Sequence, residues 1–361
     1  MKKFTLSILL FGLSLLVTVQ CSRARVNSSE ANDSAQDKQQ NLEIDYSAPP
    51  GAPFTAEEVT IDAKGFALAG TLLLPKSGAR PLPAVITITG SGQQTRDEPV
   101  PIPGLEKYRP MRQIAEALAA RGIAVLRVDD RGTGKSGGRD TLMTATTSSF
   151  ADDVRAEVAY LRSRPEIDPK RIALVGHSEG GLIAPMVAAT DPQIKAIVLM
   201  AGGGKRGDQI SIDQLNDALA RATGLTEEQK EQQRAQQREI IQAVQSGGDL
   251  SKYPPQVRLP WIKEFWTYDP LPTIRKVSQP VLILQGALDR QITADQATLL
   301  EQAAKGAGNR DVTLHIFPNL NHLFLPAKTG AFSEYSKLET TSIGGDVLKV
   351  LGDWLVAEMK K

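Results

Sequence analysis

The stretch RIALVGHSEGGLIAPMVAAT, residues 171–190, decides the fold of this chain. Residues 172–175 form a short apolar run rich in branched side chains, which is typical of a strand covered on both faces of a parallel sheet. Residues 182–189 then place apolar side chains at a helical period, and Asp191-Pro192 ends this helix. The pattern predicts a buried strand, a sharp turn and a helix, with Ser178 at the turn.

The turn itself, residues 176–180, reads G-x-S-x-G. Glycines on both sides of the serine allow a strand and a helix to pack too closely for larger side chains. Ser178 would then stand above the sheet at a helix N-terminus, where free N–H groups and the helix dipole favour a developing negative charge. We interpret Ser178 as a candidate nucleophile, and because the motif also arises by chance, its surroundings must decide.

A serine nucleophile needs a base, usually a histidine, and the chain contains only three. His177 lies inside the turn, where packing or hydrogen bonding is the simpler role. His315 falls in VTLHIF, residues 312–317, which alternates like a strand and therefore favours a structural role. His322 lies in a turn-rich loop directly after that strand, so we interpret His322 as the base.

The acid that orients the base should follow an earlier strand. Residues 281–284 form another compact apolar run, and Asp289 lies in the loop that leads out of it. The order Ser178, Asp289, His322 is the order expected in an α/β-hydrolase. The loop at residues 89–94 follows a further predicted strand, at the position where that fold supplies one oxyanion N–H. We assign this N–H to Ser91, with Gly92 as the next candidate, and the second to Glu179. The alternative for the loop is a simple glycine turn.

With these motifs in place, the chain resembles the bacterial α/β-hydrolase serine esterases, in the branch close to prolyl-oligopeptidase-like and dienelactone-hydrolase-like enzymes. The resemblance covers about residues 57–355 and rests on TGSG at 89–92, DDRGTGKS at 129–136, the serine turn, and the Asp289 and His322 loops. One departure is Thr89, which stands where many relatives have histidine.

The resemblance implies an α/β fold with a mostly parallel eight-stranded sheet, helices on both faces and an inserted helical cap. It also implies a serine esterase that cleaves esters of small to medium acyl chains through an acyl-enzyme, without a cofactor. A peptidase or aminopeptidase of the prolyl-oligopeptidase-like branch is the alternative enzyme, and a non-catalytic surface binding protein is the alternative outside enzymes.

The chain divides into four predicted parts. They are an export signal at 1–21, a disordered tether at 22–56, a hydrolase core at 57–204 and 270–361, and a cap at 205–269. Residues 1–20 combine a basic start with an apolar run, the layout of an export signal, which predicts a periplasmic or secreted protein. Cys21, the only cysteine, follows directly. Cleavage could expose it for lipidation, which would anchor the protein to a membrane, or could be a simple cut, and both interpretations stay open.

Aromatic residues cluster near the end of the predicted cap, in residues 253–268. Trp261, Phe265 and Trp266 are the candidates for binding the acyl part of a substrate. The alternative is that these rings only pack the cap onto the core, because aromatic side chains dominate ordinary cores as well.

Charge and composition exclude several other classes. With 42 Lys and Arg against 41 Asp and Glu, the chain lacks the basic surplus of nucleic-acid-binding proteins. Three histidines and one cysteine lack metal-ligand spacing. The glycines of 132–137 mimic nucleotide-binding motifs, but the following residues do not read as the required helix, and Arg131 is interpreted as a brace for the site.

Overall fold

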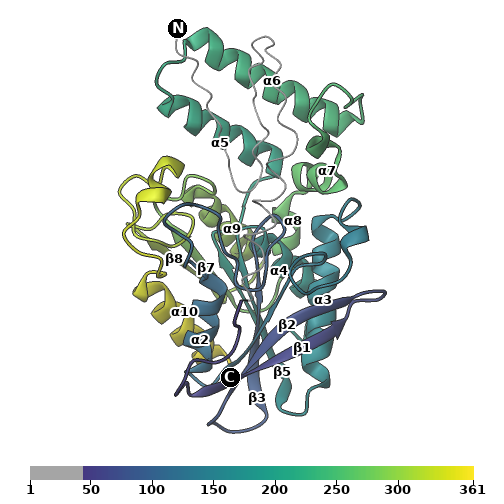
Figure 1. Ribbon diagram of the computed structural model, residues 1–361, viewed down its shortest axis with the longest axis vertical. Coiled ribbons are helices and arrows are strands. Elements are labelled where there is room, and N and C mark those ends of the chain that lie inside the picture. Colours follow the sequence, from purple (N-terminus) through teal and green to yellow (C-terminus); the bar gives the residue numbers. More distant parts are fainter. Residues whose placement is uncertain (1–43) are drawn as a thin grey trace, which may run out of the picture.

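The computed structural model describes residues 44–361, so the predicted export signal, Cys21 and most of the predicted tether lie outside the described residues. Eight strands form one sheet at the centre of the protein, in the order β1-β2-β4-β3-β5-β6-β7-β8 (Figure 1). Within this described part of the chain, only β2 runs against the other strands, pairing antiparallel with both β1 and β4. The predicted α/β class with a mostly parallel sheet is confirmed. The strands are β1 (Phe54–Asp62), β2 (Ala67–Pro75), β3 (Leu82–Ile88), β4 (Ala124–Val128), β5 (Ile167–His177), β6 (Ala196–Met200), β7 (Val281–Gly286) and β8 (Val312–Phe317).

Helices connect the strands and cover the sheet. They are α2 (Pro110–Ala119), α3 (Thr147–Ser163), α4 (Gly180–Ala188), α5 (Gly207–Arg221), α6 (Glu227–Ser246), α7 (Pro260–Thr267), α8 (Pro270–Ile274), α9 (Ala294–Gly306) and α10 (Gly345–Glu358), with short 3-10 helices η1 (Arg139–Thr141), η2 (Pro255–Arg258) and η3 (Phe332–Lys337). None of the helices in residues 44–361 is long and apolar enough to cross a membrane.

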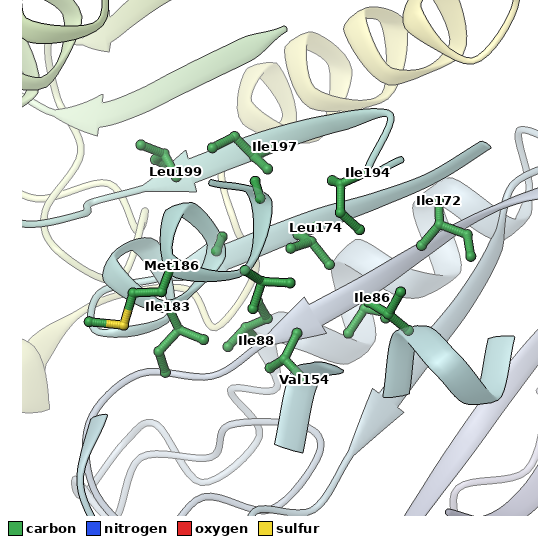
Figure 2. Packing of buried hydrophobic residues seen from close by; sticks show 14 of the residues in the cluster. Ile86, Ile88, Val154, Ile172, Leu174, Ile183, Met186, Ile194, Ile197 and Leu199 are labelled. Carbon is green, nitrogen blue, oxygen red and sulfur yellow. The ribbon is translucent and has the colours of Figure 1, made fainter. Parts of the chain in front are cut away.

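Two apolar layers hold the helices to the sheet. One layer joins the strands to α3, α4, α8 and α9, and the other joins them to α2 and α10. Figure 2 shows the first layer, where Ile183 of α4 lies next to Ile88 at the end of β3. Since both faces are covered, the central strands are continuous apolar runs, and all five residues of β6 are buried.

The segment between β6 and β7 carries α5, α6 and α7, and α5 and α6 lie at one end of the molecule, beyond the sheet (Figure 1). These helices form their own apolar cluster, to which Leu182 of α4 contributes from the core side. In α6 only Gln237, Ile240, Ile241 and Val244 are buried. The Glu- and Gln-rich sequence of α6 is therefore a solvated helix face, as its composition predicts.

The last part of the predicted tether belongs to the fold. β1 begins at Phe54, and Tyr46 is buried beneath the guanidinium of Arg96, which lies 4.2 Å from the centre of its ring. Arg112 donates hydrogen bonds to the backbone carbonyls of Asp45 and Ser47, at 2.7 and 3.0 Å. Polar composition predicts little burial for such a segment, but one aromatic ring and two arginine partners are enough to fix it to the core.

Candidate active site

The strand β5 ends in a strained turn that presents Ser178. Ser178 has a φ of 54°, a left-handed conformation that non-glycine residues rarely adopt, and its N–H donates to the Met200 carbonyl at 2.9 Å. A Cβ atom on Gly176 would lie 2.0 Å from the Gly180 carbonyl oxygen, and one on Gly180 would lie 2.4 Å from the Ile88 carbonyl oxygen. The two glycines therefore provide space for the turn, and the strain is the kind that functional sites maintain.

Asp289 and His322 meet at the same edge of the sheet, where β7 and β8 end. Nδ1 of His322 donates to Oδ2 of Asp289 at 2.8 Å, and both side chains are buried. The second carboxylate oxygen accepts the N–H groups of Gln291 and Ile292, at 2.8 and 2.9 Å. These bonds fix the carboxylate, which in turn fixes the imidazole. Among residues 44–361, Nε2 of His322 has no hydrogen-bond partner.

The structure joins Asp289 to His322, whereas within residues 44–361 no hydrogen bond joins Ser178 to His322. His322 still lies close to the serine turn, because its ring centre is 4.9 Å from that of His177, the residue before Ser178. Catalytic hydrogen bonds in enzymes without substrate are often long and tighten only in the complex. His315, by contrast, lies within β8 and packs against Phe317 in a tilted arrangement, with ring centres 4.4 Å apart.

The two residues expected to supply oxyanion N–H groups lie in the serine turn and in the loop after β3. Glu179 is the residue directly before α4, and Ser91 follows Gly90 in the loop after β3. A Cβ atom on Gly90 would lie 3.1 Å from Cβ of Ser178, so this loop touches the serine turn. Among the described residues, the N–H groups of Ser91 and Glu179 have no hydrogen-bond acceptor, which leaves both available for an anion.

The side chain of Glu179 links the serine turn to the segment between β6 and β7. Its Oε1 accepts the Trp261 indole N–H at 2.7 Å and the Thr147 hydroxyl at 2.6 Å. Burial raises the pKa of Glu179 above its ordinary value, although these hydrogen bonds act in the opposite direction. A second contact fixes α7 to α3: the Glu264 carboxylate accepts hydrogen bonds from the hydroxyl and the backbone N–H of Ser148, at 2.6 and 2.9 Å.

Of the three aromatic residues proposed to bind substrate, only Trp261 is partly exposed. Phe265 is buried against Trp261, with ring centres 5.4 Å apart. Trp266 is fully buried, and its indole N–H donates to the Ser211 hydroxyl at 3.1 Å. Phe265 and Trp266 thus pack α7 onto its neighbours, which favours the packing role that the sequence also allowed for them.

Three of the carboxyl groups that line a small cavity beside the Gly90 loop are those of Asp130, Glu157 and Glu179. Burial raises the pKa of each above its ordinary value. These groups therefore hold their protons to higher pH than exposed carboxyls do, which limits the negative charge close to the serine. No group of three or more His, Cys, Asp or Glu side chains in residues 44–361 is arranged to hold a metal ion.

Two further residues belong to this region. Arg131 forms a two-fold ion pair with Asp153, at 2.7 and 2.8 Å, so it braces the loop after β4 onto α3, as interpreted from the sequence. Glu98 was missed by sequence reasoning: its Oε1 accepts the Gly90 N–H at 2.9 Å and lies 2.7 Å from Nδ1 of His177. An acidic residue in a long loop gives no sequence signal for such a contact.

The sheet order, the strained serine between β5 and α4, and the histidine–aspartate pair at the same edge define a serine hydrolase of the α/β-hydrolase class. Residues 104–327 match the model of one family within that class, described as serine aminopeptidase, S33. The chain belongs to this family.

Individual relatives agree with this placement. The chain is 26% identical to Esterase EstD of Thermotoga maritima over 307 residues, which are 84% of this chain and 68% of the relative. Among solved structures, it is similar to Est1E of Butyrivibrio proteoclasticus, solved with bound ferulic acid (TM-score 0.55, 19% identity, 84% of this chain and 100% of that one). An esterase of Pyrococcus furiosus superimposes with a TM-score of 0.57 at 17% identity, over 88% of this chain and 96% of that one. At these identities, the solved structures support the fold alone.

Proposed function

We propose that this protein hydrolyses carboxylic esters of small to medium acyl chains through an acyl-enzyme on Ser178. The observation that carries the proposal is the buried hydrogen bond between Asp289 and His322, at the sheet edge that also presents Ser178. The name of the relative Esterase EstD supports the same reaction class.

In the proposed reaction, the Ser178 hydroxyl attacks the ester carbonyl while Nε2 of His322 takes its proton. Asp289 holds the imidazole and stabilises the imidazolium that forms. The N–H groups of Ser91 and Glu179 bind the oxyanion. The tetrahedral intermediate collapses by breaking the bond to the alcohol, which leaves with the proton from His322. A water then attacks the acyl-enzyme by the same route and releases the acid, so no cofactor is required.

Trp261 is the one aromatic residue that we retain as a candidate for acyl contact. Its indole is held by Glu179, the residue after the nucleophile, and it remains partly exposed. A rigid aromatic surface at this position would favour apolar acyl groups over charged ones.

A peptidase is the second candidate function, because the family to which the chain belongs is described as serine aminopeptidase. The same triad cleaves amides. Turnover of matched ester and aminoacyl-amide substrates with the same acyl group separates the two candidates, and we expect the ester to be preferred.

We further propose that the protein is exported, on the sequence of residues 1–20, which lie outside the described part of the structure. Cell fractionation should find the mature protein outside the cytoplasm. A mass measurement on its N-terminus distinguishes a lipidated Cys21 from a simple cut, and an uncleaved cytoplasmic protein contradicts the proposal.

The reaction is tested by Ser178→Ala, with Ser163→Ala as a matched control. Ser163 lies at the end of α3, and within the described part of the chain its hydroxyl bonds only to the carbonyl of Tyr160. Ser178→Ala should reduce kcat on a p-nitrophenyl ester by about 10⁴ to 10⁶ while the fold is retained. The control should keep its activity. Turnover near the wild-type rate in folded Ser178→Ala contradicts the proposed nucleophile.

A further inference from the structure

His177, the residue before Ser178, is a buried titratable group that the proposed reaction does not use. Its Nδ1 lies 2.7 Å from Oε1 of Glu98, and its Nε2 lies 3.0 Å from the backbone carbonyl oxygen of His322. His177 and Glu98 are each only 5% exposed. The site thus contains a second histidine–carboxylate pair beside that of His322 and Asp289.

The partners of this second pair determine its protonation. A carbonyl oxygen can only accept, so Nε2 of His177 must carry a proton. Oε1 of Glu98 already accepts the Gly90 N–H at 2.9 Å, so its short contact with Nδ1 requires a further proton between the two side chains. Burial alone would lower the pKa of His177, but Glu98 raises it above its ordinary value, which favours an imidazolium beside a carboxylate.

The pair connects the two loops on which the proposed reaction depends. On one side, Glu98 holds Gly90, the residue before the proposed oxyanion donor Ser91. On the other side, His177 holds the backbone of the proposed base His322. Charge-assisted hydrogen bonds of this kind are about twice as strong as neutral ones, so a shift of either loop would break a strong buried contact.

Glu98 also has two energetically unfavourable features that a residue needed only for packing would not require. Its φ is 54°, a left-handed conformation in a residue that is not glycine. Its second oxygen, Oε2, is buried without a hydrogen-bond partner among residues 44–361. Strain and unsatisfied polar atoms persist where surrounding contacts enforce them, and they cluster at functional sites.

We propose that His177 and Glu98 are positioning residues: they hold the loop after β3, which carries Ser91, and the loop after β8, which carries His322, in fixed positions relative to each other. Loss of the proton that the two side chains share ends this function at alkaline pH. This inference rests on the proposed function. Besides Glu98, the charged and titratable groups that face His177 are Asp289 and His322, from the loops after β7 and β8. The two carboxylates both favour the imidazolium. Glu98 in turn faces Tyr108 and Asp130.

The proposal predicts a bell-shaped dependence of kcat on pH. On the alkaline side of the optimum, the rate falls as His177 loses its proton. Glu98→Gln keeps an acceptor for the Gly90 N–H but removes the negative charge, so the pKa of His177 falls. The alkaline limb should therefore move to lower pH by about one unit, and kcat at the optimum should fall about tenfold with KM nearly unchanged.

His177→Gln provides a second variant, because its amide can still donate to the His322 carbonyl but does not titrate. Its alkaline limb should disappear. Matched controls are His315→Gln, on the strand β8, and Glu358→Gln, a buried carboxylate of α10 that pairs with Lys361. Both controls should keep the wild-type profile. Titration with a fluorophosphonate counts competent sites in each preparation, so that misfolded protein does not enter kcat.

An alkaline limb that stays in place in Glu98→Gln, with kcat lowered equally at every pH, would show a structural role only and would overturn the inference. A wild-type profile without an alkaline limb would overturn it as well, even if His177→Gln does not fold. If Ser178→Ala is inactive while the limb does not move, only this inference fails. If folded Ser178→Ala keeps its turnover, the proposed function fails, and the inference fails with it.

Discussion

Replacing Asp289 by Asn tests the orientation of the base with almost no change in shape. In the structure, Oδ1 accepts the Gln291 and Ile292 N–H groups. Oδ2 accepts from Nδ1 of His322 at 2.8 Å and from the Gln285 side-chain amide at 3.0 Å. The Asn oxygen should remain on the two N–H groups, because the opposite orientation would lose both bonds. The amide nitrogen then faces Nδ1 and donates to it. The imidazole proton must move to Nε2, the nitrogen that should accept from Ser178.

The expected loss in kcat for Asp289→Asn is about 10⁴, the size associated with a histidine held in the wrong tautomer. At about 1.36 kcal/mol for each factor of ten, this corresponds to about 5.4 kcal/mol of transition-state stabilisation. The variant should fold, since its two backbone bonds are retained. The assay is kcat on a p-nitrophenyl ester with circular dichroism and Tm, and the surface variant Asp353→Asn is the control. If Asp289→Asn keeps kcat within tenfold of wild type, Asp289 does not orient the base.

Three further predictions concern other residues of the site and the cap. His322→Ala should lose nearly as much turnover as Ser178→Ala, and the double variant should be little worse, whereas His315→Gln should stay near the wild-type rate. Turnover is compared at matched folded fraction, and the reverse result would make His315 the base. Trp266→Ala should lower the free energy of unfolding in urea by about 3–5 kcal/mol, because it empties a fully buried site, and a change below about 1 kcal/mol would contradict this packing. Burial raises the folded-state pKa of Glu179 above its ordinary 4.5, so wild type should lose stability relative to Glu179→Gln as pH rises above about 4.5. The Tm of both proteins, measured from pH 4 to 8, tests this prediction. A difference in Tm that stays constant with pH would contradict it.

The serine turn and the two late loops could be predicted from sequence because each depends on local patterns. Glycine spacing and a buried apolar run specify the turn at Ser178. Asp289 and His322 follow strands, and parallel strands end at one common edge, so their loops must lie near each other. The apolar pattern and the common edge of parallel strands were therefore sufficient to place Asp289 and His322, which are 33 positions apart, near each other.

Glu98 and Tyr46 could not be predicted because their roles depend on contacts between distant segments. Glu98 reaches His177 across 79 positions and does so from a left-handed backbone conformation, which no residue pattern signals. Tyr46 lies in a polar segment, and its burial depends on contacts with distant residues such as Arg96.

The spacing of the aromatic residues along α7 contains information that their number alone does not. Trp261 and Phe265 are four positions apart and share one helix face, whereas Trp266 lies on another face and points toward Ser211 of α5. The helical period therefore separates the residue that meets Glu179 from the one that fills the interior.

The central claim is that Ser178 is the nucleophile, and the most direct measurement is the site of a covalent adduct. Wild-type protein treated with a fluorophosphonate and digested should carry one adduct, on the peptide that contains Ser178, in proportion to the activity lost. Ser178→Ala should carry none, and Asp289→Asn should be labelled far more slowly, because its base is misoriented. An adduct on a different residue, or full inactivation of wild type with Ser178 unmodified, would contradict the account.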